Sequence, residues 1–325
     1  MPDVTHASDF DGIEQEWTDF LPNSTTNTVF VTPWWQKTWW DNFGVGWELH
    51  LTSVRSEGAT IGIAPLMLNN GELRLVGDPD IVDYLDFLVL DDRSAEFYGK
   101  LWEHAKGLDW RRTVLTGVSD GSHTLSEFAS LAEADGCQVT IEEEDTTPLT
   151  DLPGSWDEYL LGLTKKNRHE LRRKIRRLER AGEFRQYARS DLSTLSEDMG
   201  DFFHLLRISR TDKEEFLTPE REKFFIDTAV ELIGRDQFKL NFLELDGERV
   251  ACCISFDYDG EYLLYNSGFN PEYYRLSVGL INKALCIKDA IEEGRRRFDF
   301  LRGSERYKYD LGGVDRLVYR VTVDR

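Results

Sequence analysis

The sequence contains few cysteines and few methionines, and no spacing typical of metal ligands. Its 325 residues include four Cys, three Met and six His. There is no CxxC pair and no HExxH pair, so neither a zinc site nor another metal site is predicted. Cys252 and Cys253 are adjacent, and their side chains would therefore point to opposite faces of a strand. We expect reduced thiols and no metal.

Long apolar runs and a basic, signal-like start are also absent. The longest apolar run, residues 61–68, is interrupted by Pro65 and is much shorter than the roughly 18 residues that span a bilayer. The first residues are acidic where a secretory signal would be basic. These absences predict a cytoplasmic protein without a membrane span. The hydrophobic content of 40%, with nine Trp, excludes disorder over most of the chain.

Positive charge is scarce overall and is concentrated in one segment. Asp and Glu number 60 against 39 Lys and Arg, so the protein is acidic, with a formal net charge of −21. Residues 164–181 nevertheless contain nine basic side chains and two acidic ones. Leu171, Ile175 and Leu178 recur there at helical spacing, and Gly182 follows as a stop signal. We predict a helix whose apolar stripe packs on the protein and whose basic face offsets nearby acids or binds phosphate.

The order of predicted elements repeats once along the chain. Thr32-Pro33 opens an aromatic helix, and Thr218-Pro219 opens another, 186 residues later. Each helix precedes a strand–turn–strand hairpin, with Gly58 and Gly247 at the turns. A third strand, a helix ending in Gly and a short strand follow in both copies. A chain of this length also exceeds the roughly 250–300 residues of a single core, so two domains are expected.

This repeat predicts an α/β (mixed α+β) fold of two tandem units. Each unit would be a mixed, mostly antiparallel sheet flanked by helices, with one parallel crossover strand. We expect an N-terminal unit over residues 1–150, a basic linking helix over 151–182 and a C-terminal unit over 183–325. The aperiodic segment 144–154 is the natural linker. The acceptor of any reaction would enter a cleft between the halves.

Three segments of the C-terminal copy, 265–271, 274–279 and 298–303, together with Glu305, Tyr307 and Lys308, carry a resemblance to a known family. With the repeated element order, they resemble the GNAT acyltransferases over about residues 28–312. The chain is most similar to the tandem-GNAT group that includes the CelD-like (cellulose-biosynthesis) acyltransferases and, more remotely, the Fem aminoacyl transferases. The resemblance implies an enzyme that moves an acyl group, expected to be acetyl, from acyl-CoA to an amine or hydroxyl of a sugar, an envelope precursor or a small molecule.

The donor site is predicted at the start of the second helix of the C-terminal copy. Ser277 would cap this helix, and Gly279 would allow close backbone approach. The free N–H groups and the positive end of the helix dipole would then bind an anion. An ordinary Ser-capped helix is the alternative. The usual GNAT loop differs from this segment, since Arg275 precedes Gly279 by four residues, so acyl-CoA is inferred from the resemblance.

Further residues are predicted to bind the donor. Arg275 can bind a phosphate through its guanidinium fork, and Leu276 and Val278 belong to the same segment. The backbone at Tyr265 and Asn266 could polarise the acyl carbonyl. Lys308 is predicted to bind a phosphate or a substrate carboxylate. At the corresponding helix start of the first copy, Asp91 and Asp92 would repel phosphate, so the N-terminal unit is predicted to lack the cofactor.

Acyl transfer also needs an acid for the thiolate and a base for the acceptor. The resemblance implies that Tyr307 protonates the thiolate. Asp83 and Asp86 are the predicted bases, because their apolar surroundings could raise a carboxyl pKa, although both also suit a turn or a helix cap. His204 and Asp299 are weaker alternatives.

Two other functions stay open from the sequence. A Fem-like transferase would take an aminoacyl group from tRNA, and the basic helix over 164–181 is its only support. A non-catalytic binding module on the same fold is the other. No feature of the sequence predicts an oligomeric state.

Overall fold

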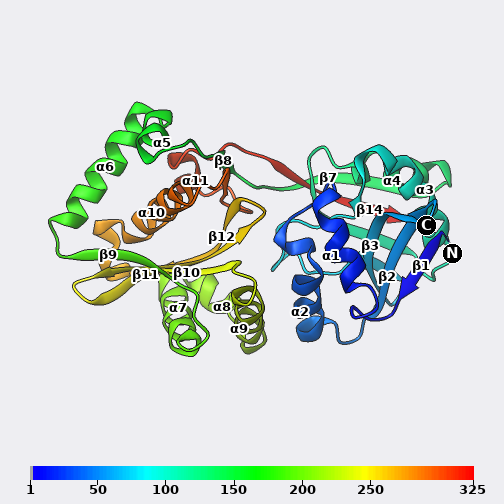
Figure 1. Cartoon of the computed structure of the whole chain (residues 1–325), viewed down its shortest axis with the longest axis horizontal. Coiled ribbons are helices and arrows are strands. Elements are labelled where there is room, and N and C mark those ends of the chain that lie inside the picture. Colours follow the sequence, from blue (N-terminus) through cyan, green and yellow to red (C-terminus); the bar gives the residue numbers. More distant parts are fainter. Residues whose placement is uncertain (1–2) are drawn as a thin grey trace. The chain divides into compact units, whose positions relative to one another are not determined.

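The computed structural model describes residues 3–325, which divide into two compact units (Figure 1). The first unit consists of the chain up to residue 146 together with residues 316–325, and the second unit consists of residues 147–315. Within residues 3–325, no helix has the length and apolar character needed to cross a membrane.

The first unit is built on a mixed eight-stranded sheet in the order β1-β2-β3-β4-β6-β14-β7, with β5 paired to β3. Helix α3 packs on β1, β2 and β3, while α4 packs on β7 and β14. The strands are β1 Val4–Ala7, β2 Glu48–Ser56, β3 Ala59–Asn69, β4 Glu72–Leu75, β5 Leu88–Val89, β6 Arg112–Ser119, β7 Gln138–Thr146 and β14 Leu317–Asp324. The helices are α1 Glu14–Phe20, α2 Pro33–Phe43, α3 Ser94–Lys106 and α4 Glu127–Ala134.

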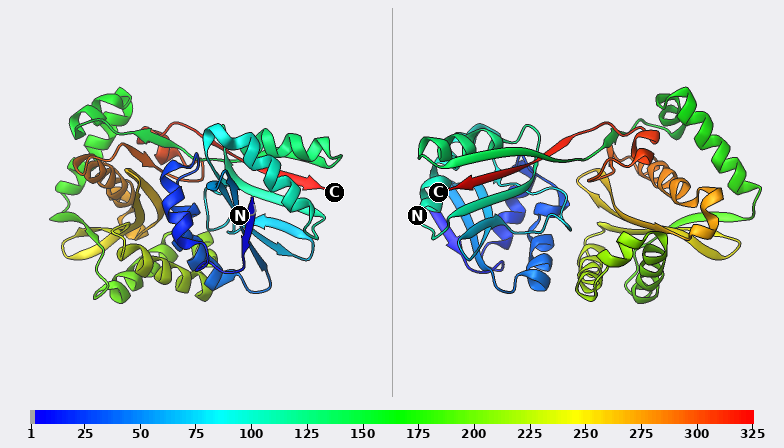
Figure 2. Two further views of the ribbon diagram at one scale, coloured as in Figure 1. Left: turned by 45° about the vertical axis from the view of Figure 1, so that its right-hand side comes forward. Right: turned by 180° about the vertical axis from the view of Figure 1, so that it is seen from behind.

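The second unit has a six-stranded sheet in the order β8-β13-β12-β11-β10-β9. Helices α5, α6, α10 and α11 lie on one side of this sheet, and α7, α8 and α9 lie on the other (Figures 1 and 2). The strands are β8 Leu149–Asp151, β9 Phe184–Arg189, β10 Phe238–Leu245, β11 Glu248–Tyr258, β12 Glu261–Phe269 and β13 Arg297–Asp299. The helices are α5 Trp156–Gly162, α6 Lys165–Glu179, α7 Leu195–Ser209, α8 Thr211–Phe216, α9 Pro219–Ile233, α10 Val278–Glu292 and α11 Arg306–Asp310.

The two units follow the predicted repeat, and the mixed α/β fold is confirmed. Each has a Thr-Pro helix, α2 or α9, whose Thr side chain accepts a hydrogen bond from the backbone N–H of Trp35 or Arg221. An antiparallel hairpin follows, β2–β3 or β10–β11. The next strand, β4 or β12, then pairs in parallel with the strand after the crossover helix, β6 or β13.

The boundaries of the two observed units differ from the predicted boundaries. Strand β14 was expected in the C-terminal unit, but it pairs with β6 and β7 of the first sheet. Its partners lie about 200 residues away, and a non-local pairing leaves no local signal in the chain. The predicted linker 144–154 contains the end of β7 and all of β8, and α6 belongs to the second unit.

Helix α10 is the central support of the second unit. Its apolar side chains, including Ile281 and Ile287, are buried against the sheet. The predicted apolar stripe of α6 packs in the same clusters, where Leu171 and Leu178 are buried. This packing holds the start of α10 beside the basic helix.

Candidate active site

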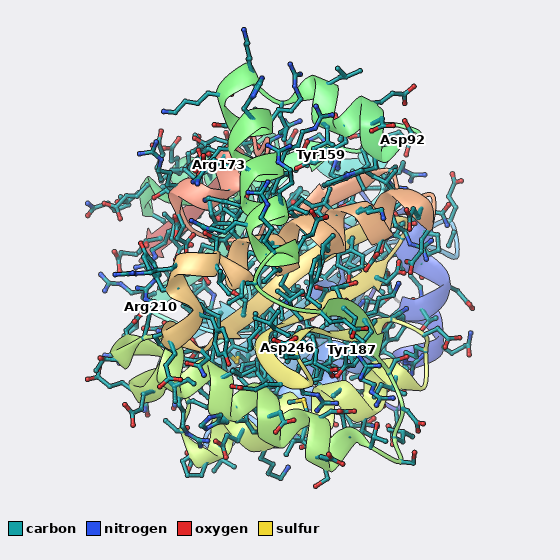
Figure 3. The ribbon with its side chains drawn as sticks, turned by 90° about the vertical axis from the view of Figure 1, so that its left-hand side faces the viewer. Asp92, Tyr159, Arg173, Tyr187, Arg210 and Asp246 are labelled. Atoms are coloured by element: carbon teal, nitrogen blue, oxygen red, sulfur yellow. The ribbon has the colours of Figure 1, made fainter. Side chains whose placement is uncertain are left out.

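A cavity of about 920 Å³ opens in the second unit at the start of α10. Its walls come from α6, the α7–α8 junction, β12, the first turn of α10 and α11. Figure 3 labels two of the lining residues, Arg173 on α6 and Arg210 at the α7–α8 junction. The charged side chains that line it are Arg173, Lys174, Arg177, Arg210, Lys213, Arg275, Lys283 and Arg306, with a single acid, Glu305. Such a wall attracts an anionic ligand.

The first turn of α10 leaves backbone donors without acceptors. Ser277 precedes the helix in the left-handed conformation (φ 61°), and its side chain does not cap the helix. Its carbonyl oxygen accepts from the N–H of Leu280 and of Ile281, at 3.1 and 3.0 Å. Over residues 3–325, no acceptor is found for the N–H of Val278 or of Gly279. The predicted cap position is therefore occupied, but the cap bond is missing and these donors stay available to a ligand.

A half-buried arginine, Arg177, adds a further free donor at the same place. The Arg177 guanidinium donates from Nη2 to Ser277 Oγ at 3.0 Å, while its buried Nε has no partner in the described chain. Gly279 lies against Phe269, since an added Cβ would come within 3.2 Å of that ring. An anion with several oxygens, such as a diphosphate, fits this set of donors.

Tyr307 lies on α11 in the wall of the same cavity. The Lys283 ammonium lies 4.9 Å from the centre of its ring. Burial, and then the nearby Glu305 carboxylate, raise the pKa of the Tyr307 phenol above its ordinary value. The phenol is therefore protonated at neutral pH and can donate its proton.

The predicted ligand-binding role of Lys308 does not fit its position. Lys308 is 2% exposed. Its ammonium donates to the carbonyl oxygens of Leu301, Arg302 and Gly303 at 2.9, 2.6 and 2.9 Å, and it pairs with Glu305 at 3.0 Å. These bonds use its donors, so Lys308 holds the 301–303 loop beneath α11 and thereby positions Tyr307.

We expect Lys308→Met to lower the free energy of unfolding by about 2–4 kcal/mol, because several buried carbonyls lose their donor. Lys288→Met is the matched control, since Lys288 lies on α10 with its side chain 40% exposed. It should change stability by less than about 0.5 kcal/mol. Urea unfolding of both variants measures the difference, and equal stability would contradict a structural role for Lys308.

The other predicted donor residues border the cavity in different ways. Arg275, Leu276, Ser277, Val278 and Gly279 line it. The register of β12 against β11 shifts near Tyr265, and β13 pairs with β12 only over residues 261–263, so the later part of β12 is splayed from β13.

Tyr265 and Asn266 lie on this splayed part of β12, next to the cavity-lining Ser267. The Tyr265 ring packs between Phe225 and Phe256, with ring centres 5.7 and 4.8 Å away. Asn266 accepts from the N–H of Ser267 at 2.9 Å and from Lys213 at 3.4 Å. Their backbone can still contribute to the site, whereas their side chains are engaged in packing or local hydrogen bonds.

The predicted bases are not part of this cavity. Asp83 and Asp86 lie in the first unit. Asp86 is 4% exposed and accepts hydrogen bonds from Ser122, Thr124 and the N–H of Phe87. Burial raises the pKa of the Asp86 carboxyl, and this effect outweighs the hydrogen bonds, which lower that pKa. The bonds give Asp86 a structural role in the first unit, and catalysis by either residue stays a prediction.

The two weaker candidate bases are also placed elsewhere. His204 lines a separate cavity of about 540 Å³. Asp299 is buried and accepts from the N–H of Leu301 at 2.7 Å.

Several lining residues were not predicted as part of the donor site, among them Arg177, Lys213 and Lys283. Arg177 belongs to the basic helix, and its charge was noted without a position relative to Ser277. Lys283 lies one turn after Gly279 on α10, and this spacing was a usable signal. Lys213 reaches the site from α8, about 50 residues before β12, and no local pattern indicates that contact.

The comparisons with known proteins concern the fold that carries this site. Residues 165–309, all within the second unit, match the family model described as an acetyltransferase (GNAT) domain. No curated protein matches the sequence. A structure of FemX matches with a TM-score of 0.67 and 14% identity, covering 98% of this chain and 97% of that one.

Two further solved structures share the two-unit arrangement. A tandem GNAT protein from the clavulanic acid biosynthesis pathway has a TM-score of 0.56 and 15% identity, over 98% of this chain and 97% of that one. The C-terminal domain of a putative lysylphosphatidylglycerol synthetase from Agrobacterium fabrum has a TM-score of 0.61 and 12% identity, over 98% and 92%. At these identities the likeness concerns the fold alone.

The second unit thus has the GNAT fold, and this fold supports acyl transfer in general. The chain as a whole has a tandem GNAT fold with similarity to FemX, as the sequence resemblance implied. Its assignment to the CelD-like group stays a prediction.

Proposed function

We propose that the protein is an acyltransferase whose second unit binds acyl-CoA, with acetyl-CoA as the donor. The acceptor would be an amine or hydroxyl of a sugar, an envelope precursor or a small molecule. One observation carries the proposal. The two N–H groups of α10 without acceptors, the Arg177 guanidinium with its partnerless Nε and the Tyr307 phenol belong to the same cavity. We propose a single donor site, in the second unit.

Different parts of the cavity would bind different parts of the donor. The N–H groups of Val278 and Gly279, with Arg177 and Arg275, would hold the phosphates at the start of α10. The splayed backbone of β12 near Ser267 would lie beside the acyl carbonyl. The thioester supplies an acyl group that is activated for attack.

The acceptor nitrogen or oxygen would attack the acyl carbonyl directly within a ternary complex, and the C–S bond of the thioester would break. Tyr307 would donate its proton to the departing thiolate, and the acceptor would lose its own proton to water.

A Fem-like, aminoacyl-tRNA-dependent reaction is the second candidate. It is favoured by α6, because three of its cations, Arg173, Lys174 and Arg177, line the cavity. Other basic side chains of the helix, such as Arg172 and Arg176, are exposed and would be available to a nucleic acid. Both candidates use the same chemistry, a cationic wall around phosphates.

Direct binding measurements separate these functions. Calorimetric titration should give micromolar affinity for acetyl-CoA, and native mass spectrometry should detect CoA on the purified protein. Binding of tRNA should be weak at 150 mM salt. Strong, salt-dependent tRNA binding without acetyl-CoA binding would favour the Fem-like reaction. Binding of neither ligand, with an unchanged melting temperature, would favour a non-catalytic module.

A further inference from the structure

Two lysines at the inner part of the cavity have no carboxylate partner. Lys283 is 8% exposed and lines the cavity with Lys213. Over residues 3–325, no carboxylate oxygen lies within 4.0 Å of either ammonium group. The negative charge of the Glu305 carboxylate favours the protonated form of both lysines. Glu305 is itself paired with the Lys308 ammonium at 3.0 Å.

The hydrogen bonds of these lysines leave donors unused. Lys283 donates to the carbonyl oxygen of Gly279 at 3.2 Å. Lys213 donates to the carbonyl oxygen of Ser267 and, at 3.4 Å, to Asn266 Oδ1. An ammonium group has three donors, so two remain at Lys283 and one at Lys213. Burial lowers the pKa of both lysines, that of Lys213 to about 8, as expected for cations without a full counter-charge.

Unpaired buried ammonium groups are costly in a folded protein, and a ligand anion would remove that cost. We infer that Lys213 and Lys283 form an anion site, distinct from the backbone N–H groups of Val278 and Gly279, which binds a carboxylate carried by a substrate. The site lies where reaction would occur, because Lys283 is 4.9 Å from the ring centre of Tyr307 and Lys213 bonds the splayed strand β12. This inference rests on the proposed function in that the same cavity holds the donor.

The carboxylate has two possible sources, the transferred acyl group or the acceptor. Lysine ammonium groups are compact charges and suit one carboxylate, whereas the guanidinium and backbone donors at the start of α10 suit phosphates. A dicarboxylic acyl group such as succinyl would bring the carboxylate with the donor. An acceptor with a carboxylate, such as an amino acid, would bring it separately.

Calorimetry with three probes tests the site at 150 mM salt: acetyl-CoA, succinyl-CoA and succinate, the last with and without saturating CoA. If the acyl group carries the carboxylate, succinyl-CoA should bind about tenfold more tightly than acetyl-CoA. If the acceptor carries it, the two donors should bind equally, and succinate should bind together with CoA. In both cases Lys213→Met and Lys283→Met should remove the effect, while Lys288→Met should retain it.

The inference would be overturned if succinyl-CoA had no advantage and succinate bound no better than an equal ionic strength of chloride. Succinate binding that survives both methionine variants would overturn it as well. Two variants are used because Lys213 is partly exposed, so its replacement tests the site even if Lys283→Met impairs folding. Failure of this inference and failure of the donor proposal give different results. Absence of CoA binding would reject the acyltransferase, whereas succinate binding to the free protein would still report the lysine site.

Discussion

Replacing Tyr307 by Phe is expected to lower kcat for acyl transfer by about 100-fold while the Kd for acyl-CoA changes less than about twofold. The reason is the division of roles within the cavity. Tyr307 lies on α11, whereas the N–H groups that would hold the phosphates belong to α10, and only the Tyr307 hydroxyl is removed. The ring that contacts Lys283 and Phe300 is retained.

Steady-state kinetics and calorimetric titration of the same preparation measure the two quantities. Because the pKa of Tyr307 is raised, the phenol keeps its proton well into the alkaline range. The wild-type rate should therefore show no fall between pH 7 and 9 from loss of this acid. Tyr309→Phe, on the same short helix, is the control, because Tyr309 bonds Asp315 at 2.7 Å and does not line the cavity. Equal rates for the wild type and Tyr307→Phe would place the acid elsewhere.

The fold could be predicted where the same local sequence signals occur in both halves of the chain. The Thr-Pro helix starts and the glycine turns recur at a nearly constant spacing, and both observed units follow them. Strand β14 was misplaced because nothing in residues 317–324 shows that β6 and β7 are its partners. Strand β8 was taken as linker because three residues are too few to show alternation.

The candidate site was predictable only in part, because a sequence shows residue type but not hydrogen-bond use. Lys308 and Arg177 illustrate the limit. Both are basic, but the Lys308 ammonium already donates to three backbone carbonyl oxygens. Arg177 instead keeps a buried Nε donor without an acceptor. Ser277 was placed correctly at the start of α10, but its left-handed backbone and its bond from Arg177 have no sequence signature.

The partnerless Nε of Arg177 leads to the second large effect. Arg177→Ala should weaken acyl-CoA binding by about 10- to 100-fold, since a charge-assisted hydrogen bond to phosphate contributes roughly 1.5–3 kcal/mol. Stability without ligand should change little, because within residues 3–325 the one side-chain hydrogen bond lost is that to Ser277 Oγ. Calorimetric titration gives the affinity, and a melting curve of the free protein gives the stability.

Arg176→Ala is the matched control, since Arg176 is the neighbouring residue on α6, is exposed and does not line the cavity. The two substitutions remove the same charge from the same helix, so they separate direct contact from the general field of α6. A direct contact predicts a large loss for Arg177→Ala and less than about a twofold loss for Arg176→Ala, because exposed charges are screened beyond about 8 Å at physiological salt. Equal losses for both variants would mean that α6 acts only through its summed charge, and the donor phosphates would then have to be held by the backbone of α10 and Arg275 alone.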